Sequence, residues 1–165
     1  MELSTENLIL KTVTEIEIDE ISRMWKYPAT ISNFHARRIF TKMKRRHSQN
    51  QIKSINYLCF GIFQKENPDK VIGWCTLDGR YTKKTVILFC VITEELRCKG
   101  YATQCTKALL RYAMVDMQYD FVIGKCKKED QAAYKVMQKA GMRNNVIVKT
   151  GFGFYMDREM LENLK

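Results

Sequence analysis

The chain has 165 residues, of which 45% are hydrophobic and 28% charged, and its formal net charge is +10. This length fits one domain that buries about two-thirds of its unfolded surface, and the composition excludes a disordered or fibrous chain. No apolar run reaches the ~18 residues of a membrane-spanning helix, and residues 1–4 lack the basic start of a secretory signal. We therefore expect a single cytoplasmic domain over residues 1–165, without a membrane partner.

Residues 8–13 predict a strand, and the segment after them predicts a helix. Thr14 with Glu17 three residues later forms a capping box, which is typical of the first turn of a helix. Apolar residues at helical spacing would form its buried face: Ile18, Ile21, Met24 and Trp25. Pro28 is expected to end this helix.

A second predicted helix, at residues 35–46, has a basic outer face. Its cationic residues are Arg37, Arg38, Lys42, Lys44, Arg45 and Arg46, and its apolar stripe is Ala36, Ile39, Phe40 and Met43. A solvated face without a partner explains these charges, and so does contact with an acidic protein or with RNA, so both interpretations stay open. The polar residues 48–54 that follow predict a mobile loop.

The middle of the chain predicts an antiparallel meander of three strands, at residues 56–64, 71–77 and 86–92. The turn residues at 65–70 predict a hairpin between the first two, and Asp78-Gly79-Arg80 predicts the turn into the third. Helical spacing returns later in a set of apolar residues: Cys105, Ala108, Leu109, Tyr112 and Ala113. Residues 121–125 predict a further short strand.

The last part of the chain predicts a capped helix and a closing hairpin. Asp130 is the expected N-cap and Gly141 the expected end of the helix. The residues that line one face of it are Ala133, Val136, Met137 and Ala140. Residues 145–149 and 152–156 flank a Thr-Gly turn as the strands of a hairpin. The whole order of elements predicts one α+β domain.

Six cysteines, at positions 59, 75, 90, 98, 105 and 126, form no C-x-x-C pair and lie mostly in apolar segments. Because only His35 and His47 could join them as ligands, no metal site is expected. Reduced thiols that pack as small core residues are the favoured interpretation. Cys98 is the exception, since it lies in a basic stretch and is expected to be exposed.

That basic stretch, residues 97–103, has the sequence Arg-Cys-Lys-Gly-Tyr-Ala-Thr and lies between a predicted strand and a predicted helix. A short loop at this place presents unpaired backbone N–H groups at a helix N-terminus, where phosphate oxygens bind well. Its spacing fits neither the P-loop nor the Gly-x-Gly-x-x-Gly loop of dinucleotide folds. The stretch therefore predicts a site for another phosphorylated cofactor.

The loop resembles the acetyl-CoA loop of the GNAT superfamily of N-acetyltransferases, Arg/Gln-x-x-Gly-x-Gly/Ala. Residues 130–142 are similar to the family's second motif, and Glu-Asn-Leu-Ile-Leu at 6–10 resembles its first strand. The resemblance covers almost the whole chain and implies a three-layer α/β/α domain whose mixed, mostly antiparallel sheet is splayed at the cofactor slot. The Gly-Tyr-Ala-Thr phrase is most similar to the ribosomal-protein-alanine N-acetyltransferase branch.

The resemblance implies acetyl-CoA as the acetyl donor. Backbone groups of a central strand would bind its pantetheine arm like an added strand, and loop amides would hold its pyrophosphate. The implied cofactor-binding residues are Cys90, Ile92, Arg97, Cys98, Lys99, Gly100, Tyr101, Ala102, Thr103, Asp130, Ala133 and Met137. Cys98 stands where the family usually has glycine, so its φ is expected to be negative. Asp130 replaces the usual Asn, and core packing explains Tyr101 and Thr103 as well as ligand contact does.

The implied reaction is direct attack of a primary amine, on a peptide N-terminus or a small molecule, in a ternary complex. A base or a water chain must deprotonate the amine, whose pKa is about 10.4 for a lysine-type group, and a backbone N–H near Ile92 is the implied oxyanion donor. Val86 and Met137 occupy the positions of the family's usual Glu and Tyr, so the catalytic residues stay unidentified. Asp78 and Tyr134 are candidates, although turn formation explains Asp78 equally well and packing is the favoured explanation of Tyr134.

Two other functions stay open. A non-catalytic CoA-binding regulatory domain would account for the apolar residues at both recognised catalytic positions. An RNA- or ribosome-associated module would use the basic helix at residues 35–46. Relatives are often homodimers through their terminal strands, so a homodimer is also compatible with the resemblance.

Overall fold

The computed structural model describes residues 1–14, 17, 20–21, 38, 41–42, 45–46, 50, 55–80, 82–148 and 151–164. Within them lies an eight-stranded sheet of order β1-β2-β3-β4-β5-β6-β8-β7. The strands are β1 (Glu2–Ser4), β2 (Leu8–Thr12), β3 (Tyr57–Gln64), β4 (Asn67–Asp78), β5 (Thr85–Ile92), β6 (Phe121–Lys127), β7 (Arg143–Val148) and β8 (Gly151–Asp157). The helices are η1 (Glu94–Leu96), α3 (Tyr101–Arg111), its continuation η2 (Tyr112–Asp116), α4 (Gln131–Lys139) and α5 (Arg158–Glu162).

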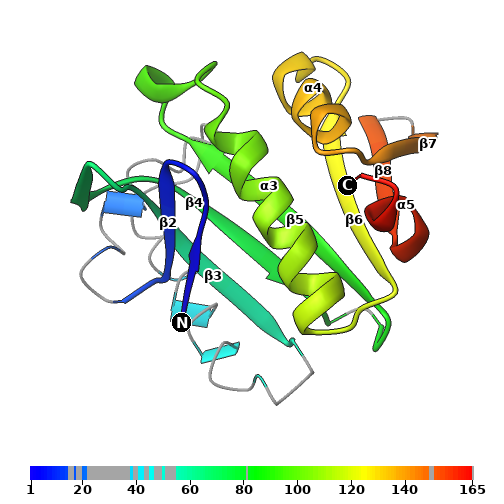
Figure 1. Cartoon of the computed structure of the whole chain (residues 1–165), viewed down its shortest axis with the longest axis horizontal. Coiled ribbons are helices and arrows are strands. Elements are labelled where there is room, and N and C mark those ends of the chain that lie inside the picture. The colour runs from blue at the N-terminus through cyan, green and yellow to red at the C-terminus, as the bar shows by residue number, and fades with distance from the viewer. Residues whose placement is uncertain are drawn as a thin grey trace.

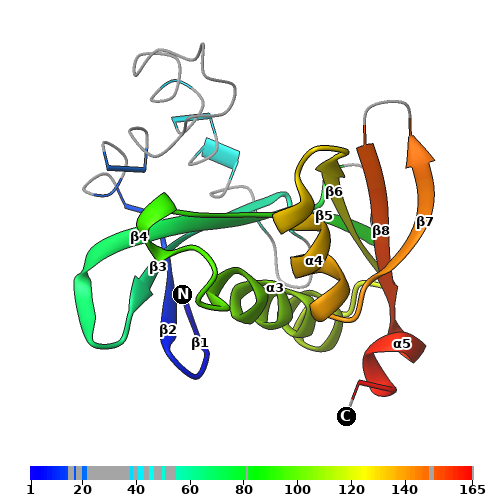
Figure 2. The ribbon, with the colours of Figure 1, turned by 90° about the horizontal axis from the view of Figure 1, so that it is seen from above.

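The sheet is mixed, as the resemblance implies. All of the described strand pairs are antiparallel except β5 with β6, which run parallel. Figure 1 shows α3 crossing in front of β5, with α4 in front of β6, and the same two helices lie to one side of the sheet in Figure 2. The expected α+β class and the mostly antiparallel sheet are thus confirmed.

Apolar side chains are buried on both faces of the central strands. On one face, Val86 and Leu88 of β5 pack with Leu109 of α3 and Met137 of α4 in the larger core. On the other face, a smaller core joins residues of the β3–β4 hairpin to a helical residue of the N-terminal region: Tyr57, Cys59, Phe63, Val71, Trp74 and Ile21. Because both faces are covered, residues 71–77 of β4 are buried without a break.

Several predicted boundaries are confirmed, together with their capping contacts. The Glu17 carboxylate accepts a hydrogen bond from the Thr14 N–H at 2.8 Å, as a capping box requires. Asp130 caps α4 by accepting from the Ala133 N–H at 2.9 Å, and Gly141 beyond this helix has φ +88°. The two helices predicted before residue 47 and the loop predicted at residues 48–54 lie mostly outside the described residues. The described residues of the second helix are helical: Arg38, Thr41, Lys42, Arg45 and Arg46.

Three local features differ from the sequence-based expectations. β4 begins at Asn67, not at residue 71, because an irregular register opposite Phe63 and Gln64 places Pro68 outside the hydrogen-bonded ladder. The edge strand β1 was not predicted; the N-terminal amine donates to the Thr12 hydroxyl at 2.9 Å and anchors it. Helix α5 was also missed, since it has only five residues.

Of the helices in the described part of the chain, none combines the length and the apolar character that a membrane crossing requires.

Candidate functional site

The parallel strands β5 and β6 part after three paired positions. Thr85 lies opposite Phe121 and Ile87 opposite Ile123, and no further pairing joins these two described strands. β5 nevertheless continues to Ile92, while β6 stays paired with β8 up to Lys127. The second half of β5 therefore has a backbone edge that β6 does not cover.

The strand register shows which residues present that edge. The Thr93 N–H donates to the Ile72 carbonyl at 2.9 Å, so the odd-numbered residues of β5 direct their backbone groups toward β4. Successive residues alternate, so the N–H and C=O groups of Cys90 and Ile92 point to the side where β6 diverges. The two residues singled out from the sequence for the pantetheine arm thus have the orientation that this role needs.

The Arg97 side chain closes one end of this edge. Its Nε donates to the Ile92 carbonyl at 3.2 Å, from a position five residues further along the chain. A ligand that uses the same carbonyl must share it with Arg97 or displace the guanidinium. The main chain of Arg97 is also fixed, because its N–H donates to the Glu94 carbonyl at 3.3 Å in η1.

The loop between η1 and α3 contains two residues with left-handed backbone conformations. Cys98 has φ +64° and Gly100, the N-cap of α3, has φ +81°. The expectation of a negative φ at Cys98 is therefore wrong: the loop keeps the conformation that a glycine would adopt. For a residue with a β-carbon this conformation costs about 1–2 kcal/mol, which the surrounding turn must offset.

Gly100 borders open space. A β-carbon built on it would meet no heavy atom within 4 Å. The first three amides of α3, from Tyr101, Ala102 and Thr103, have no intrahelical partners, because the first helical bond is from the Gln104 N–H to the Gly100 carbonyl. Lys99 and Arg97 are exposed beside them. The loop thus offers N–H donors, positive charge and room in front of the helix.

Polar contacts with the N-terminal hairpin hold the first turn of α3. The Gln104 side-chain oxygen accepts from the Thr5 hydroxyl at 2.9 Å and from the Asn7 N–H at 3.3 Å. The Tyr101 hydroxyl accepts from Gln64 Nε2 at 3.1 Å. This contact favours a packing role for Tyr101, which the sequence left open between core and ligand.

Met137 of α4 lies where β6 leaves β5. A β-carbon on Gly124, the residue after the last paired position of β6, would come within 2.7 Å of the Met137 sulfur. This thioether therefore forms an apolar wall at the point of parting. Tyr134, one turn earlier, packs its ring edge against Phe152 and Phe154 of β8, at centroid distances of 4.9 and 5.0 Å.

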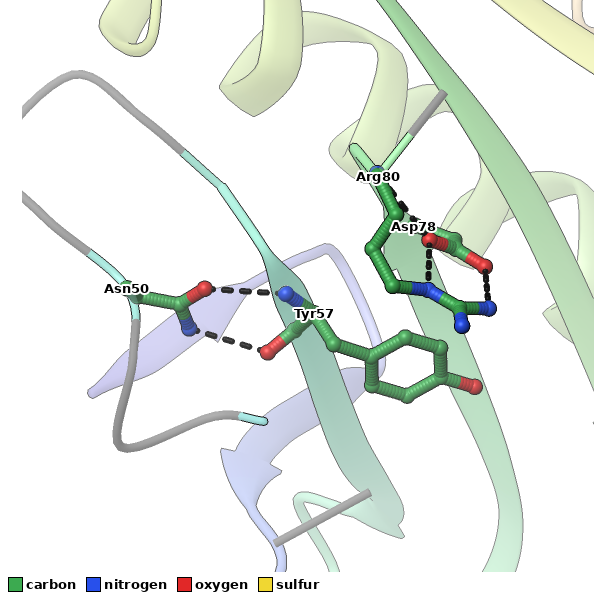
Figure 3. Close-up of polar contacts among 4 residues, drawn as sticks. All are labelled: Asn50, Tyr57, Asp78 and Arg80. Carbon is green, nitrogen blue, oxygen red and sulfur yellow. Dashed lines mark hydrogen bonds and ion pairs between the residues drawn. The ribbon is translucent and has the colours of Figure 1, made fainter. Parts of the chain in front are cut away.

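A polar group lies on the opposite face of the sheet, at the end of β4 (Figure 3). Asp78 pairs in register with Ile87, the residue at which β5 and β6 part. Its carboxylate accepts from Arg80 Nε at 2.8 Å and from the Arg80 N–H at 3.2 Å, and its second oxygen pairs with Arg80 Nη2. The Arg80 guanidinium lies 5.8 Å from the centre of the Tyr57 ring.

Tyr57 itself is fixed through its backbone. The Asn50 side chain accepts from the Tyr57 N–H and donates to the Tyr57 carbonyl, each at 2.9 Å, as Figure 3 shows. Burial raises the pKa of the Tyr57 phenol well above its usual range, so the hydroxyl stays protonated. The sequence analysis did not select Asn50, Tyr57 or Arg80. The predicted Asp-Gly-Arg turn could have indicated Arg80, because it places this residue close to Asp78.

The chain is similar to known proteins in sequence and in fold. A Bacillus subtilis (strain 168) protein, the uncharacterized N-acetyltransferase YnaD, is 24% identical over 151 residues, covering 90% of this chain and 86% of that protein.

Two solved structures show the same fold. The apo form of FdhC, a nucleotide-linked sugar GNAT, has a TM-score of 0.82 and 11% identity over 99% of this chain and 93% of that one. RimL, the ribosomal L7/L12 alpha-N-protein acetyltransferase in complex with coenzyme A, has a TM-score of 0.80 and 12% identity over 95% of this chain and 98% of that one.

Residues 7–143 match the acetyltransferase (GNAT) domain family, and this match covers most of the chain. The chain therefore belongs to the GNAT family and is an N-acetyltransferase that uses acetyl-CoA.

Proposed function

We propose that the chain binds acetyl-CoA along the uncovered edge of β5 and transfers the acetyl group directly to a primary amine in a ternary complex. The observation that carries this proposal is the parting of β5 and β6 next to a helix N-terminus with open space before it. When bound, acetyl-CoA supplies an activated thioester, so the protein has mainly to position the two reactants.

The residues present fit this cofactor. Backbone groups of Cys90 and Ile92 would bind the pantetheine arm, and the amides of residues 97–103 would hold the pyrophosphate with help from the α3 dipole. Lys99 and Arg97 would neutralise phosphate charge. Met137 and Ala133 would line the slot from α4, while Asp130 contributes as the cap of that helix.

The acceptor amine would approach from the face of the sheet that carries Asp78. The face with α3 is filled by the larger core, whereas Phe89 of β5 is exposed on the Asp78 side, 5.1 Å from the Trp74 ring centre. Asp78 is the candidate for attracting the ammonium form and receiving its proton. Because both of its oxygens already accept from Arg80, proton uptake would weaken one of these bonds. The backbone N–H near Ile92 stays the proposed oxyanion donor.

The ring contacts of Tyr134 with β8 support a packing role, so we do not assign the thiolate proton to it. The neutral Tyr57 phenol could donate a proton, but it lies on β3, two strands from β5. Water remains the proposed proton source for the leaving thiolate.

Among possible acceptors, we infer a peptide N-terminus, as in the ribosomal-protein branch. The Gly-Tyr-Ala-Thr phrase and the likeness to RimL support this choice, whereas the likeness to FdhC supports a small-molecule acceptor.

A thiol-release assay separates these possibilities. Acetyl-CoA should raise the melting temperature of the chain, and one class of amine, presented as peptides, polyamines or amino sugars, should release free coenzyme A. Stabilisation without turnover by any class would contradict direct transfer to these amines. No stabilisation at saturating acetyl-CoA would refute the cofactor site itself. RNA binding that coenzyme A does not relieve, with a steep salt dependence, would favour the basic helix as the functional surface.

A further inference from the structure

Two cysteines form a cross-strand pair beside the uncovered edge of β5. Cys75 of β4 lies directly opposite Cys90 of β5 in the antiparallel register, and both are free thiols. Side chains of directly opposite residues lie on the same face of a sheet, which here is the α3 face. Cys75 belongs to the larger core, and Cys90 packs against that core. The sheet itself therefore holds these two thiols next to each other.

The hydrogen-bond pattern of the two strands suits this pair to a disulfide. The Thr93 N–H donates to the Ile72 carbonyl at 2.9 Å, so these two residues form a hydrogen-bonded pair, and the pairs alternate from there. Cys75 and Cys90 lie three residues away along their strands and form a non-hydrogen-bonded pair. The α-carbons of such a pair are about 4.5 Å apart, and disulfides join α-carbons about 4.4–6.8 Å apart. A bridge thus needs little movement of either strand.

The two thiols differ in their access to solvent. Cys75 is 0% exposed, whereas Cys90 is half-buried. Leu88 and Ile92, the neighbours of Cys90 on the same face of β5, are also buried. The side of Cys90 that stays open is the one from which β6 has parted. External reagents therefore reach Cys90 from the proposed cofactor slot, and they do not reach Cys75.

The order of reaction follows from this difference. Burial raises the pKa of the Cys75 thiol, which keeps it protonated. The thiolate is the nucleophile in disulfide exchange, so Cys75 is a poor first attacker. An external disulfide should therefore react first at Cys90, and Cys75 acts only on a disulfide that its neighbour already carries.

We propose that Cys90 is a modification site for low-molecular-weight disulfides and that Cys75 is its resolving thiol, which removes the adduct by forming a cross-strand disulfide. In the first step the Cys90 thiolate attacks one sulfur of glutathione disulfide, so a mixed disulfide forms and one glutathione thiolate leaves. In the second step Cys75 gives up its proton and attacks the Cys90 sulfur, and the second glutathione leaves as a thiol. Two protein thiols are oxidised while one external disulfide is reduced to two thiols, so atoms and electrons balance.

The consequence for the cofactor rests on the proposed function. The mixed disulfide would place a tripeptide on Cys90, whose backbone is proposed to bind the pantetheine arm, so this adduct should block acetyl-CoA. The cross-strand disulfide instead draws the Cys90 sulfur toward β4 and leaves the backbone edge of β5 free. Resolution by Cys75 should therefore restore access to the cofactor site.

Peptide mapping tests the pair without reference to the cofactor. Cleavage after lysine and arginine yields the peptides 71–80, 85–97 and 100–107, each with one cysteine. The reduced full-length chain is treated with glutathione disulfide, its remaining thiols are alkylated, and the unreduced digest is analysed by mass spectrometry. Peptide 71–80 should be linked to peptide 85–97. A link between 85–97 and 100–107, or no link, would overturn the assignment of the resolving thiol.

Three variants separate the two steps. C75S should stop with one glutathione on Cys90, and C90S should give neither this adduct nor the link. C105S is a matched change at another fully buried thiol of the same core, and it should give the wild-type link. If C75S fails to fold, C75A gives the same readout with no polar group to bury. A C75S or C75A chain without glutathione on Cys90 would overturn the assignment of the modification site.

Calorimetry with acetyl-CoA tests the connection to the slot. The oxidised wild type should bind acetyl-CoA like the reduced wild type, whereas C75S with glutathione on Cys90 should bind at least about tenfold more weakly than reduced C75S. If reduced C75S binds acetyl-CoA and the adduct binds it equally well, the connection to the slot is wrong. If the cross-strand link forms while the reduced wild type binds no acetyl-CoA, the thiol pair stands and the proposed function fails.

Discussion

Gly100→Ala separates the backbone role of this glycine from its role in ligand access. At φ +81° an alanine should cost the folded chain about 1–2 kcal/mol. No heavy atom lies within 4 Å of the added methyl group, so steric strain in the free protein should add little. For a chain of this size the penalty corresponds to a fall of about 2–8 °C in melting temperature.

The same methyl group would project into the open space in front of the α3 amides. We therefore expect the affinity for acetyl-CoA, measured by calorimetry on the folded variant, to fall at least about tenfold, or 1.4 kcal/mol. Gly141→Ala is the matched control, because Gly141 also has a left-handed backbone at φ +88°. Its β-carbon would come within 2.4 Å of the Leu164 side chain, which is 51% exposed and can move aside, so this variant should lose a similar amount of stability while it keeps its affinity. Equal affinities in the two variants would refute the assignment of the loop to the pyrophosphate.

Three further predictions concern charge and protonation. Lys99→Gln should weaken acetyl-CoA binding several-fold at low salt and less at high salt, whereas Lys107→Gln, at an exposed position of α3, should not. Equal binding curves for the two variants would exclude a phosphate contact of Lys99. Asp78→Asn should lower kcat/KM with the accepted amine at least about tenfold and leave the affinity for acetyl-CoA unchanged. The control Asp120→Asn, which breaks surface ion pairs, should leave kcat/KM near the wild-type value. Wild-type turnover by Asp78→Asn would show that Asp78 takes no part in the reaction. The raised pKa of Tyr57 stabilises the fold below the unfolded pKa of about 10, and this contribution is lost as pH rises through the folded pKa. Tyr57→Phe should therefore make the unfolding free energy, measured by urea denaturation, fall less steeply between about pH 10 and 12. The same dependence on pH in the variant and the wild type would contradict the assignment.

The elements that could be predicted are those with a local sequence pattern, such as an apolar run or a helix-capping residue. Apolar runs gave β3, β4 and β5 to within a few residues, and the Asp130 and Gly141 signals gave both ends of α4. β1 and α5 were not predictable in this way, because three and five residues carry too little periodicity. They are held by contacts with residues distant in the chain or just outside the element, such as Thr12 for β1 and Asp157 for α5.

In the candidate site, too, some features could be predicted from the sequence and others could not. The loop at residues 97–103 was predictable because its chemistry is contiguous in sequence. The left-handed φ of Cys98 was not, since the residue type argues against it and the turn geometry imposes it. The group of Asn50, Tyr57, Asp78 and Arg80 was largely hidden, because strand pairing brings together residues from three separate segments.

The short parallel pairing of β5 with β6 also bears on the cooperativity of the domain. The described residues after position 120 form β6, α4, β7, β8 and α5. This part joins the rest of the sheet through three residue pairs, with further contacts of α4 with α3, of β6 with η2, and of Arg158 with Gln118 and Asp120. A molecule bound along the open edge would bridge the two parts of the sheet and couple their local unfolding. Hydrogen exchange in β6 and β8 should then slow on binding, although the ligand would lie chiefly on β5. In this respect acetyl-CoA would act as a structural strand as much as a reactant.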